Sequence, residues 1–177
     1  VKSTLGRSIH KLMKPRHPGT VFIDGDSVRE IMGNDLGHTL EDRWTNAQRI
    51  SRLCLHLDQQ GFDVVCAVLS IFHKSQKWNR NHFSSYKEIY LEVSIETLRR
   101  RDPKGLYARA SRELEQNVVG VDIEYNPPYA PDLVLNNDTD VAGMDLMAKK
   151  AVQDLGIDIC MTPSGAGDAG AISHIVK

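Results

Sequence analysis

Residues 20–23, Thr-Val-Phe-Ile, form a short apolar run that ends at Asp24-Gly25-Asp26. A continuously apolar run of this length is typical of a strand that is buried on both faces, as in a parallel sheet. A helix is expected to follow, from about Ser27 to Met32. Because ligands bind beyond the carboxyl ends of parallel strands, the two carboxylates stand where a site is expected.

Further apolar runs, separated by helical patterns, extend this interpretation along the chain. Strands are predicted at 64–69, 86–93 and 133–135, and helices at 5–14, from about 50 to Gly61, at 95–101 and at 140–155. Strands that alternate with helices predict an α/β fold, a parallel sheet with helices on both faces. Polar residues follow these strands too, so the carboxyl edge of the sheet is the predicted position of a site.

Composition restricts the class of protein. The chain has 177 residues, of which 41% are hydrophobic and 25% charged, enough apolar material for one compact domain. The net charge of -1 gives no overall attraction to nucleic acid or to an anionic membrane. The longest apolar run, 64–69, is too short to span a membrane, and no signal-peptide pattern opens the chain. Cys54, Cys66 and Cys160 lack paired spacing, which predicts free thiols and a cytoplasmic protein.

Three segments carry residue types suited to phosphate chemistry. Lys2-Ser3-Thr4 matches the end of a phosphate loop, although alone it is better interpreted as an ordinary helix start. Asp24 and Asp26 suit a metal site or proton transfer, and the alternative is a helix-capping turn with Asp26 as the N-cap. The basic segment 101–107, Arg-Asp-Pro-Lys-Gly-Leu-Tyr, suits a lid over phosphates, and the alternative is a solvated helix end.

Taken in order, these segments resemble the adenylylsulfate (APS) kinase family. The resemblance covers about residues 2–137, and Arg-Asp-Pro-Lys-Gly-Leu-Tyr at 101–107 is its most specific part. The other matching segments are Asp24-Gly25-Asp26-Ser27-Val28-Arg29, Asp35-Leu36-Gly37-His38, Asp42-Arg43-Trp44-Thr45-Asn46, Leu69-Ser70-Ile71-Phe72-His73 and Asn117-Val118-Val119-Gly120-Val121-Asp122.

The resemblance implies a P-loop NTPase-like fold and transfer of the ATP γ-phosphate to the ribose 3′-hydroxyl of a nucleotide, with ATP and Mg²⁺ as cofactors. It implies that Lys2, Ser3, Thr4 and Arg101 bind ATP and that Ser3 and Asp24 bind the metal. Asp24 and Asp26 would accept the hydroxyl proton, and Lys104 would stabilise transition-state charge. Ser70 matches a serine credited as a transient phosphate carrier, and direct in-line transfer is an equally good interpretation.

The acceptor is expected to be a small-molecule nucleotide, APS by default, which would be converted to PAPS in sulfate activation. The resemblance assigns it the following residues: Arg29, His38, Arg43, Asn46, Leu69, Phe72 and Val118. No nucleic acid or membrane partner is expected, and the family analogy implies a homodimer.

The sequence departs from the family on the acceptor side. His38 and Val118 stand where the family has two phenylalanines that sandwich the adenine of APS, and Ile71 and His73 replace proline and arginine. The run 75–80 and Val-Val-Gly-Val-Asp at 118–122 resemble cytidine diphosphoramidate kinases more closely, so a cytidine nucleotide is the alternative acceptor. Trp44 and Trp78 lie near the expected pocket, and each is interpreted either as a stacking surface for a base or as packing under a loop.

The two ends of the sequence also differ from the family. Val1 stands at the last glycine of the phosphate loop, so the N-terminal strand and most of that loop are expected to be missing, which would leave a central position of the sheet unfilled. Residues 1–155 are assigned to the kinase domain and 156–177 to a tail of unknown role. An inactive nucleotide-binding homologue therefore remains an alternative. A nucleoside monophosphate kinase is disfavoured, because the 101–107 motif has no role there.

Overall fold

A computed structural model of the chain describes residues 1–102, 105, 116–138, 143–158 and 173–176. Lys104, most of the predicted lid and Cys160 lie outside the described residues. So does most of the segment 156–177.

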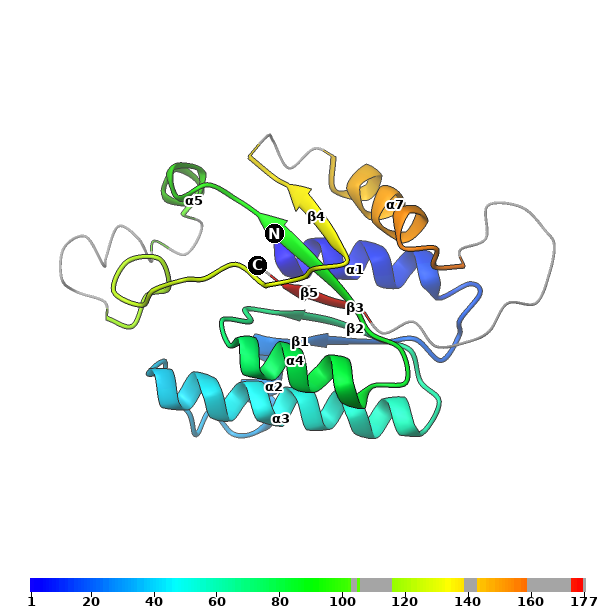
Figure 1. The fold of residues 1–177 in the computed structure, drawn as a ribbon, viewed down its shortest axis with the longest axis horizontal. Helices are drawn as coiled ribbons and strands as arrows, with labels where there is room; N and C mark the ends of the chain where they lie inside the picture. Colours follow the sequence, from blue (N-terminus) through cyan, green and yellow to red (C-terminus); the bar gives the residue numbers. More distant parts are fainter. Residues whose placement is uncertain (103–104, 106–115, 139–142, 159–172, 177) are drawn as a thin grey trace.

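Within these residues, the core of the fold is one sheet of five parallel strands (Figure 1). These are β1 (Val21–Asp24), β2 (Val64–Val68), β3 (Lys87–Glu92), β4 (Leu133–Asn136) and β5 (Ser173–Val176), in the order β1-β2-β5-β3-β4. Every residue of β2 is buried, as its unbroken apolar sequence predicts. The predicted α/β fold with a parallel sheet is confirmed.

Strand β5 holds the central position of this sheet. Residues 65–68 of β2 pair with it on one side, and residues 87–90 of β3 pair with it on the other. The expectation that this position would be unfilled is therefore wrong. A gap would leave backbone N–H and C=O groups of both β2 and β3 unpaired, and β5 satisfies them. Its residues belong to the segment 156–177, whose role the sequence leaves open.

Helices cover both faces of the sheet (Figure 1). On one face lie α1 (Lys2–Met13) and α7 (Met144–Asp154), and on the other lie α2 (Gly25–Ile31), α3 (Leu40–Gln59) and α4 (His73–His82). The short helix α5 (Ile95–Arg101) follows β3. Within the described residues, no helix is both long enough and apolar enough to cross a membrane.

Two apolar clusters fix these layers. Val65 of β2 packs with Leu5, Ile9 and Met13 of α1 in the first cluster. Its neighbours Val64 and Cys66 pack with Ile50 and Cys54 of α3 in the second. Successive strand residues point to opposite faces, so a single apolar run supplies both cores. Cys54 and Cys66 are buried thiols that form no disulfide with each other, as predicted.

Besides β5, the sequence also failed to predict helix α4. Its sequence, His-Lys-Ser-Gln-Lys-Trp-Asn-Arg-Asn-His, has no apolar stripe, because its buried residues are polar: Ser75, Gln76 and Asn79. Hydrophobic periodicity finds a helix only when apolar side chains mark its buried face.

Candidate active site

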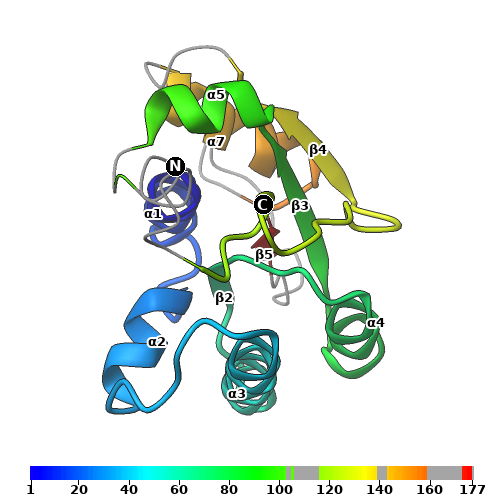
Figure 2. The ribbon, with the colours of Figure 1, turned by 90° about the vertical axis from the view of Figure 1, so that its left-hand side faces the viewer.

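All the strands are parallel, so their carboxyl ends meet at one edge of the molecule. Asp24 ends β1, Ser70 follows β2 by two residues, and Asn137 follows β4. Figure 2 looks onto this edge and shows the start of α1, which carries Lys2, Ser3 and Thr4, on the same side. The predicted phosphate and carboxylate segments therefore share one edge of the sheet.

Asp24 is held by the turn between β1 and α2. It is the N-cap of α2, and its Oδ1 accepts a 3.0 Å hydrogen bond from the N–H of Asp26. The alternative interpretation of this turn, with Asp26 as the N-cap, is corrected: Asp26 lies in the first turn of the helix. A Cβ at Gly25 would lie 3.4 Å from Cγ1 of Val68, so glycine lets this turn pass close to the end of β2.

The donor set at this edge fits Mg²⁺. The ion usually binds one or two side-chain oxygens and takes its other ligands from phosphates and water. The Ser3 hydroxyl and the Asp24 carboxylate are oxygen donors of this kind. Within the described residues, no group of three or more His, Cys, Asp or Glu side chains could hold a metal.

Two arginines, one on α2 and one on α3, hold the loop that joins these helices. Arg29 donates a 2.7 Å hydrogen bond to the carbonyl oxygen of Gly37, and Arg43 donates one of 2.9 Å to that of His38. Burial, and then the nearby Arg29 cation, lower the pKa of Arg43, while Asp122 and Asp26 act in the opposite direction. Two neighbouring guanidinium groups favour the binding of an anionic ligand next to them.

The segment 116–123 lies against Arg43. The carboxylate of Asp122 accepts hydrogen bonds from the N–H groups of Asn117 and Val118. Desolvation acts to raise the pKa of Asp122, but these two N–H donors hold it below its usual value. Val118 is only 3% exposed, so its side chain is packed within the protein.

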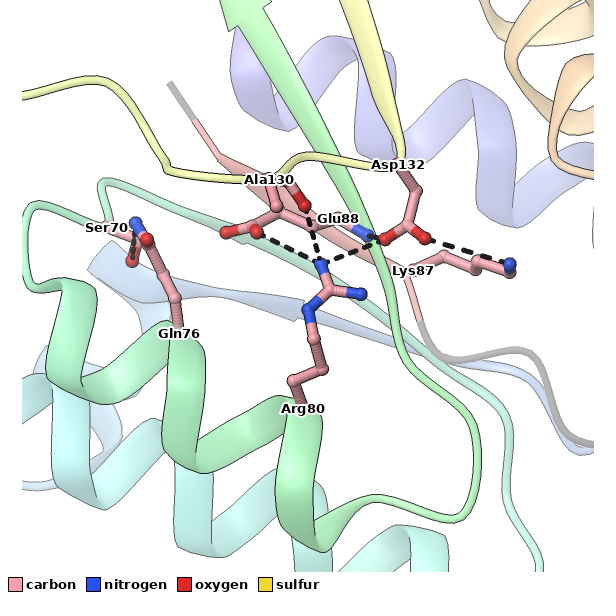
Figure 3. Close-up of polar contacts among 7 residues, drawn as sticks. All are labelled: Ser70, Gln76, Arg80, Lys87, Glu88, Ala130 and Asp132. Atoms are coloured by element: carbon pink, nitrogen blue, oxygen red, sulfur yellow. Dashed lines mark hydrogen bonds and ion pairs between the residues drawn. The ribbon is translucent and has the colours of Figure 1, made fainter.

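Ser70 and helix α4 are connected by Gln76. The Nε2 of Gln76, a buried residue, lies 3.4 Å from Oγ of Ser70 (Figure 3). One turn further along α4, Nη2 of Arg80 reaches Glu88 Oε2 at 3.3 Å and Asp132 Oδ2 at 3.1 Å. Sequence reasoning missed both Gln76 and Arg80. Their i, i+4 spacing was the available signal, but it is informative only once residues 73–82 are known to be helical.

A cavity with aromatic walls lies at the segment that joins Ser70 to helix α4. It has a volume of about 400 Å³ and is lined by Trp44, Ile71, Phe72, His73 and Lys74. The rings of Trp44 and Phe72 meet edge to face, with centroids 5.2 Å apart and an interplanar angle of 80°. Phe72, one of the residues assigned to the acceptor, thus lines a cavity together with a tryptophan from α3.

The remaining predicted site residues differ in burial and in their hydrogen bonds. Asn46 is 7% exposed, and its Oδ1 has no hydrogen-bond partner among the described residues. His38 is exposed, and Leu69 is half-buried just before Ser70. Arg101 is half-buried at the end of α5, where Nη1 donates a 2.8 Å hydrogen bond to the carbonyl oxygen of Asn137.

Comparison with known proteins gives a consistent result. Residues 1–136 match the family model described as adenylylsulphate kinase. A cytidine diphosphoramidate kinase of Campylobacter jejuni is 36% identical over 136 residues, covering 77% of this chain and 79% of that protein. An adenylyl-sulfate kinase of Paraburkholderia xenovorans is 34% identical over 138 residues and covers 77% of each chain. The solved Mycobacterium tuberculosis APS kinase CysC, in complex with AMPPNP and APS, is 26% identical with a TM-score of 0.73, covering 88% of this chain and 93% of that one.

Proposed function

This chain belongs to the adenylylsulfate kinase family, whose members transfer phosphate to a hydroxyl group, and we propose that it phosphorylates the ribose 3′-hydroxyl of APS with ATP as the donor. In this reaction the 3′-oxygen forms a bond to the γ-phosphorus. The bond from that phosphorus to the β,γ-bridging oxygen breaks, and ADP leaves. The hydroxyl proton passes to a carboxylate, which we assign to the Asp24–Asp26 turn.

The observation that carries this proposal is the position of Asp24. It lies at the carboxyl edge of the sheet, with the Lys2-Ser3-Thr4 start of α1 at the same edge. Asp26, two residues on, is close enough to Arg43 to influence its pKa. A carboxylate between a phosphate-binding helix start and a pair of guanidinium groups is suited to accept a proton as phosphate transfers.

The remaining assignments follow from charge. Lys2 would bind the β/γ-phosphates, and Ser3 with Asp24 would hold Mg²⁺, which when bound neutralises phosphate charge. Arg29 and Arg43 would hold the anionic part of the acceptor. Ser70, held by Gln76, would contact the transferring phosphate during direct in-line transfer. Arg101 and Lys104 would act from the lid.

A cytidine nucleotide is the second candidate acceptor. It is favoured by the side chains at the two positions where the family has phenylalanines. Val118 is buried and aliphatic, and His38 is exposed, so neither supplies a large aromatic surface. The similarity to the cytidine diphosphoramidate kinase of C. jejuni supports the same candidate.

Steady-state kinetics of ADP release test the proposal. The chain is supplied with ATP and magnesium and with either APS or cytidine diphosphoramidate, and kcat/KM is compared between the two acceptors. Turnover that depends on APS supports the main proposal, and a preference for the cytidine nucleotide of tenfold or more replaces it with the second. If neither acceptor raises the rate of ADP release above the ATPase background, kinase activity on these substrates is refuted.

We also expect the active protein to be a homodimer, by analogy with the family. Light scattering of the purified chain tests this directly. A mass of one chain at the concentrations used for kinetics would contradict it.

A further inference from the structure

We propose that the base of the acceptor nucleotide lies against the indole of Trp44, in the cavity that Phe72 also lines, and that Trp44 therefore determines acceptor specificity. The inference rests on the proposed function for the identity of the ligand as the acceptor. This position of the base differs from the one that the family resemblance implies, which is between the side chains at positions 38 and 118.

The cavity is a hollow that is largely open to solvent, and its aromatic walls suit a base. Its volume of about 400 Å³ falls within the range of small-ligand sites. Trp44 is half-buried, and the edge-to-face contact with Phe72 restrains its ring. An indole fixed by a second ring offers a preorganised surface for stacking a planar base.

The position of the cavity connects it to the rest of the acceptor site. Trp44 directly follows Arg43 on α3, and Ile71 directly follows Ser70 after β2. The two segments that supply the cavity walls therefore also carry the guanidinium assigned to the acceptor and the hydroxyl assigned to the transferring phosphate. Among the described residues that line the cavity, Lys74 is a cation and none is a carboxylate, so the charge of the lining suits a nucleotide phosphate.

The other candidate surfaces for a base are less suitable. Val118 is 3% exposed and has little surface to offer. Trp78 is already stacked on His82, with centroids 4.1 Å apart at 16°, and meets Phe83 edge to face. Trp78 is therefore a matched control for Trp44, since it is a tryptophan of the same protein whose ring is engaged elsewhere.

Tryptophan fluorescence tests the inference without altering the proposed contact. The chain has only two tryptophans, so Trp78→Phe leaves Trp44 as the single reporter. We expect CMP or AMP to quench its emission saturably, and ribose 5-phosphate, which has no base, to leave it unchanged. Equal quenching by all three, or by none, would overturn the inference.

Kinetics of variants at both tryptophans provide the second measurement. Trp44→Leu keeps apolar volume but removes the ring. We expect it to raise the KM for the acceptor about 5- to 150-fold, the range of one lost base stack, with the KM for ATP unchanged. Trp44→Phe is expected to recover most of the loss, and Trp78→Leu to leave the acceptor KM within twofold. An unchanged acceptor KM in Trp44→Leu contradicts the inference. If Trp44→Leu does not fold, the fluorescence titration decides alone.

The two proposals fail separately. Saturable quenching of Trp44 without turnover of either acceptor would refute the proposed function and leave a nucleotide-base site in place. Turnover with normal acceptor KM in Trp44→Leu, and without base-dependent quenching, would refute only the assignment of Trp44.

Discussion

The guanidinium of Arg43 donates a 2.7 Å hydrogen bond from Nη2 to the carbonyl oxygen of Asn117, a residue 74 positions further along the chain. Its Nε donates to the carbonyl oxygen of His38 at 2.9 Å. One side chain from α3 therefore holds two loops that come from distant parts of the sequence. Because both loops carry residues assigned to the acceptor, the geometry of the acceptor side depends on Arg43.

The first prediction concerns the replacement of this guanidinium. Lysine keeps the charge but lacks the planar fork, so Arg43→Lys cannot hold both carbonyl groups as arginine does. We expect the acceptor KM to rise about tenfold or more while the KM for ATP stays unchanged. Arg52→Lys, at an exposed position of the same helix, is the control. Equal acceptor KM values for the two variants would show that the two loops do not depend on Arg43.

The second prediction separates the chemistry of Asp24 from its structural role. Asparagine is as good an N-cap as aspartate, so Asp24→Asn is expected to keep the hydrogen bond with Asp26 and to change the free energy of unfolding by less than about 0.5 kcal/mol. It removes the carboxylate, and we expect kcat to fall about 100- to 10,000-fold. Urea unfolding and single-turnover kinetics measure the two effects. A normal kcat would remove Asp24 from the proposed chemistry.

The third prediction concerns the contact of α4 with the sheet. Arg80 lies against the carboxylates of Glu88, whose side chain is 3% exposed, and Asp132. Removing the cation leaves a buried carboxylate with less compensation, so Arg80→Met is expected to lower the free energy of unfolding by about 2 kcal/mol. Arg80→Lys retains the charge and is expected to recover part of the loss. Equal stability of the wild-type and Arg80→Met proteins in urea would show that the network does not stabilise the fold.

The fourth prediction concerns pH. The pKa of Asp122 is lower in the folded protein than the usual value of an aspartate carboxyl group, because the N–H groups of Asn117 and Val118 donate to the carboxylate. A carboxyl group with a lowered folded pKa stabilises the fold above its unfolded pKa, and the stabilisation is lost as the pH falls through the folded pKa. We therefore expect Asp122→Asn to flatten the dependence of stability on pH below about pH 4. Thermal unfolding between pH 3 and pH 6 measures this, and an unchanged slope in the variant would contradict it.

The sequence was sufficient wherever apolar patterning marks the buried side of an element. The run at 64–69 and the stripe of α1 predicted β2 and that helix because their side chains are buried against each other. Helix α4 was missed because it buries polar side chains, among them Gln76. Asp24 and Ser70 were found because each stands at the end of a strand, and the other site segments were found through the family resemblance. Their hydrogen bonds were not found, since the contact between Arg43 and Asn117 depends on tertiary packing and has no local signal in the sequence.

Strand β5 has a consequence for the order in which the protein can assemble. Among the described strands, β1 pairs with β2 and β3 pairs with β4, and residues 173–176 are the link between these two pairs. During synthesis, both pairs emerge from the ribosome before that link exists. The nascent chain must therefore carry two open sheet edges until residues 173–176 have been translated, the period in which it is most exposed to aggregation and to chaperone binding.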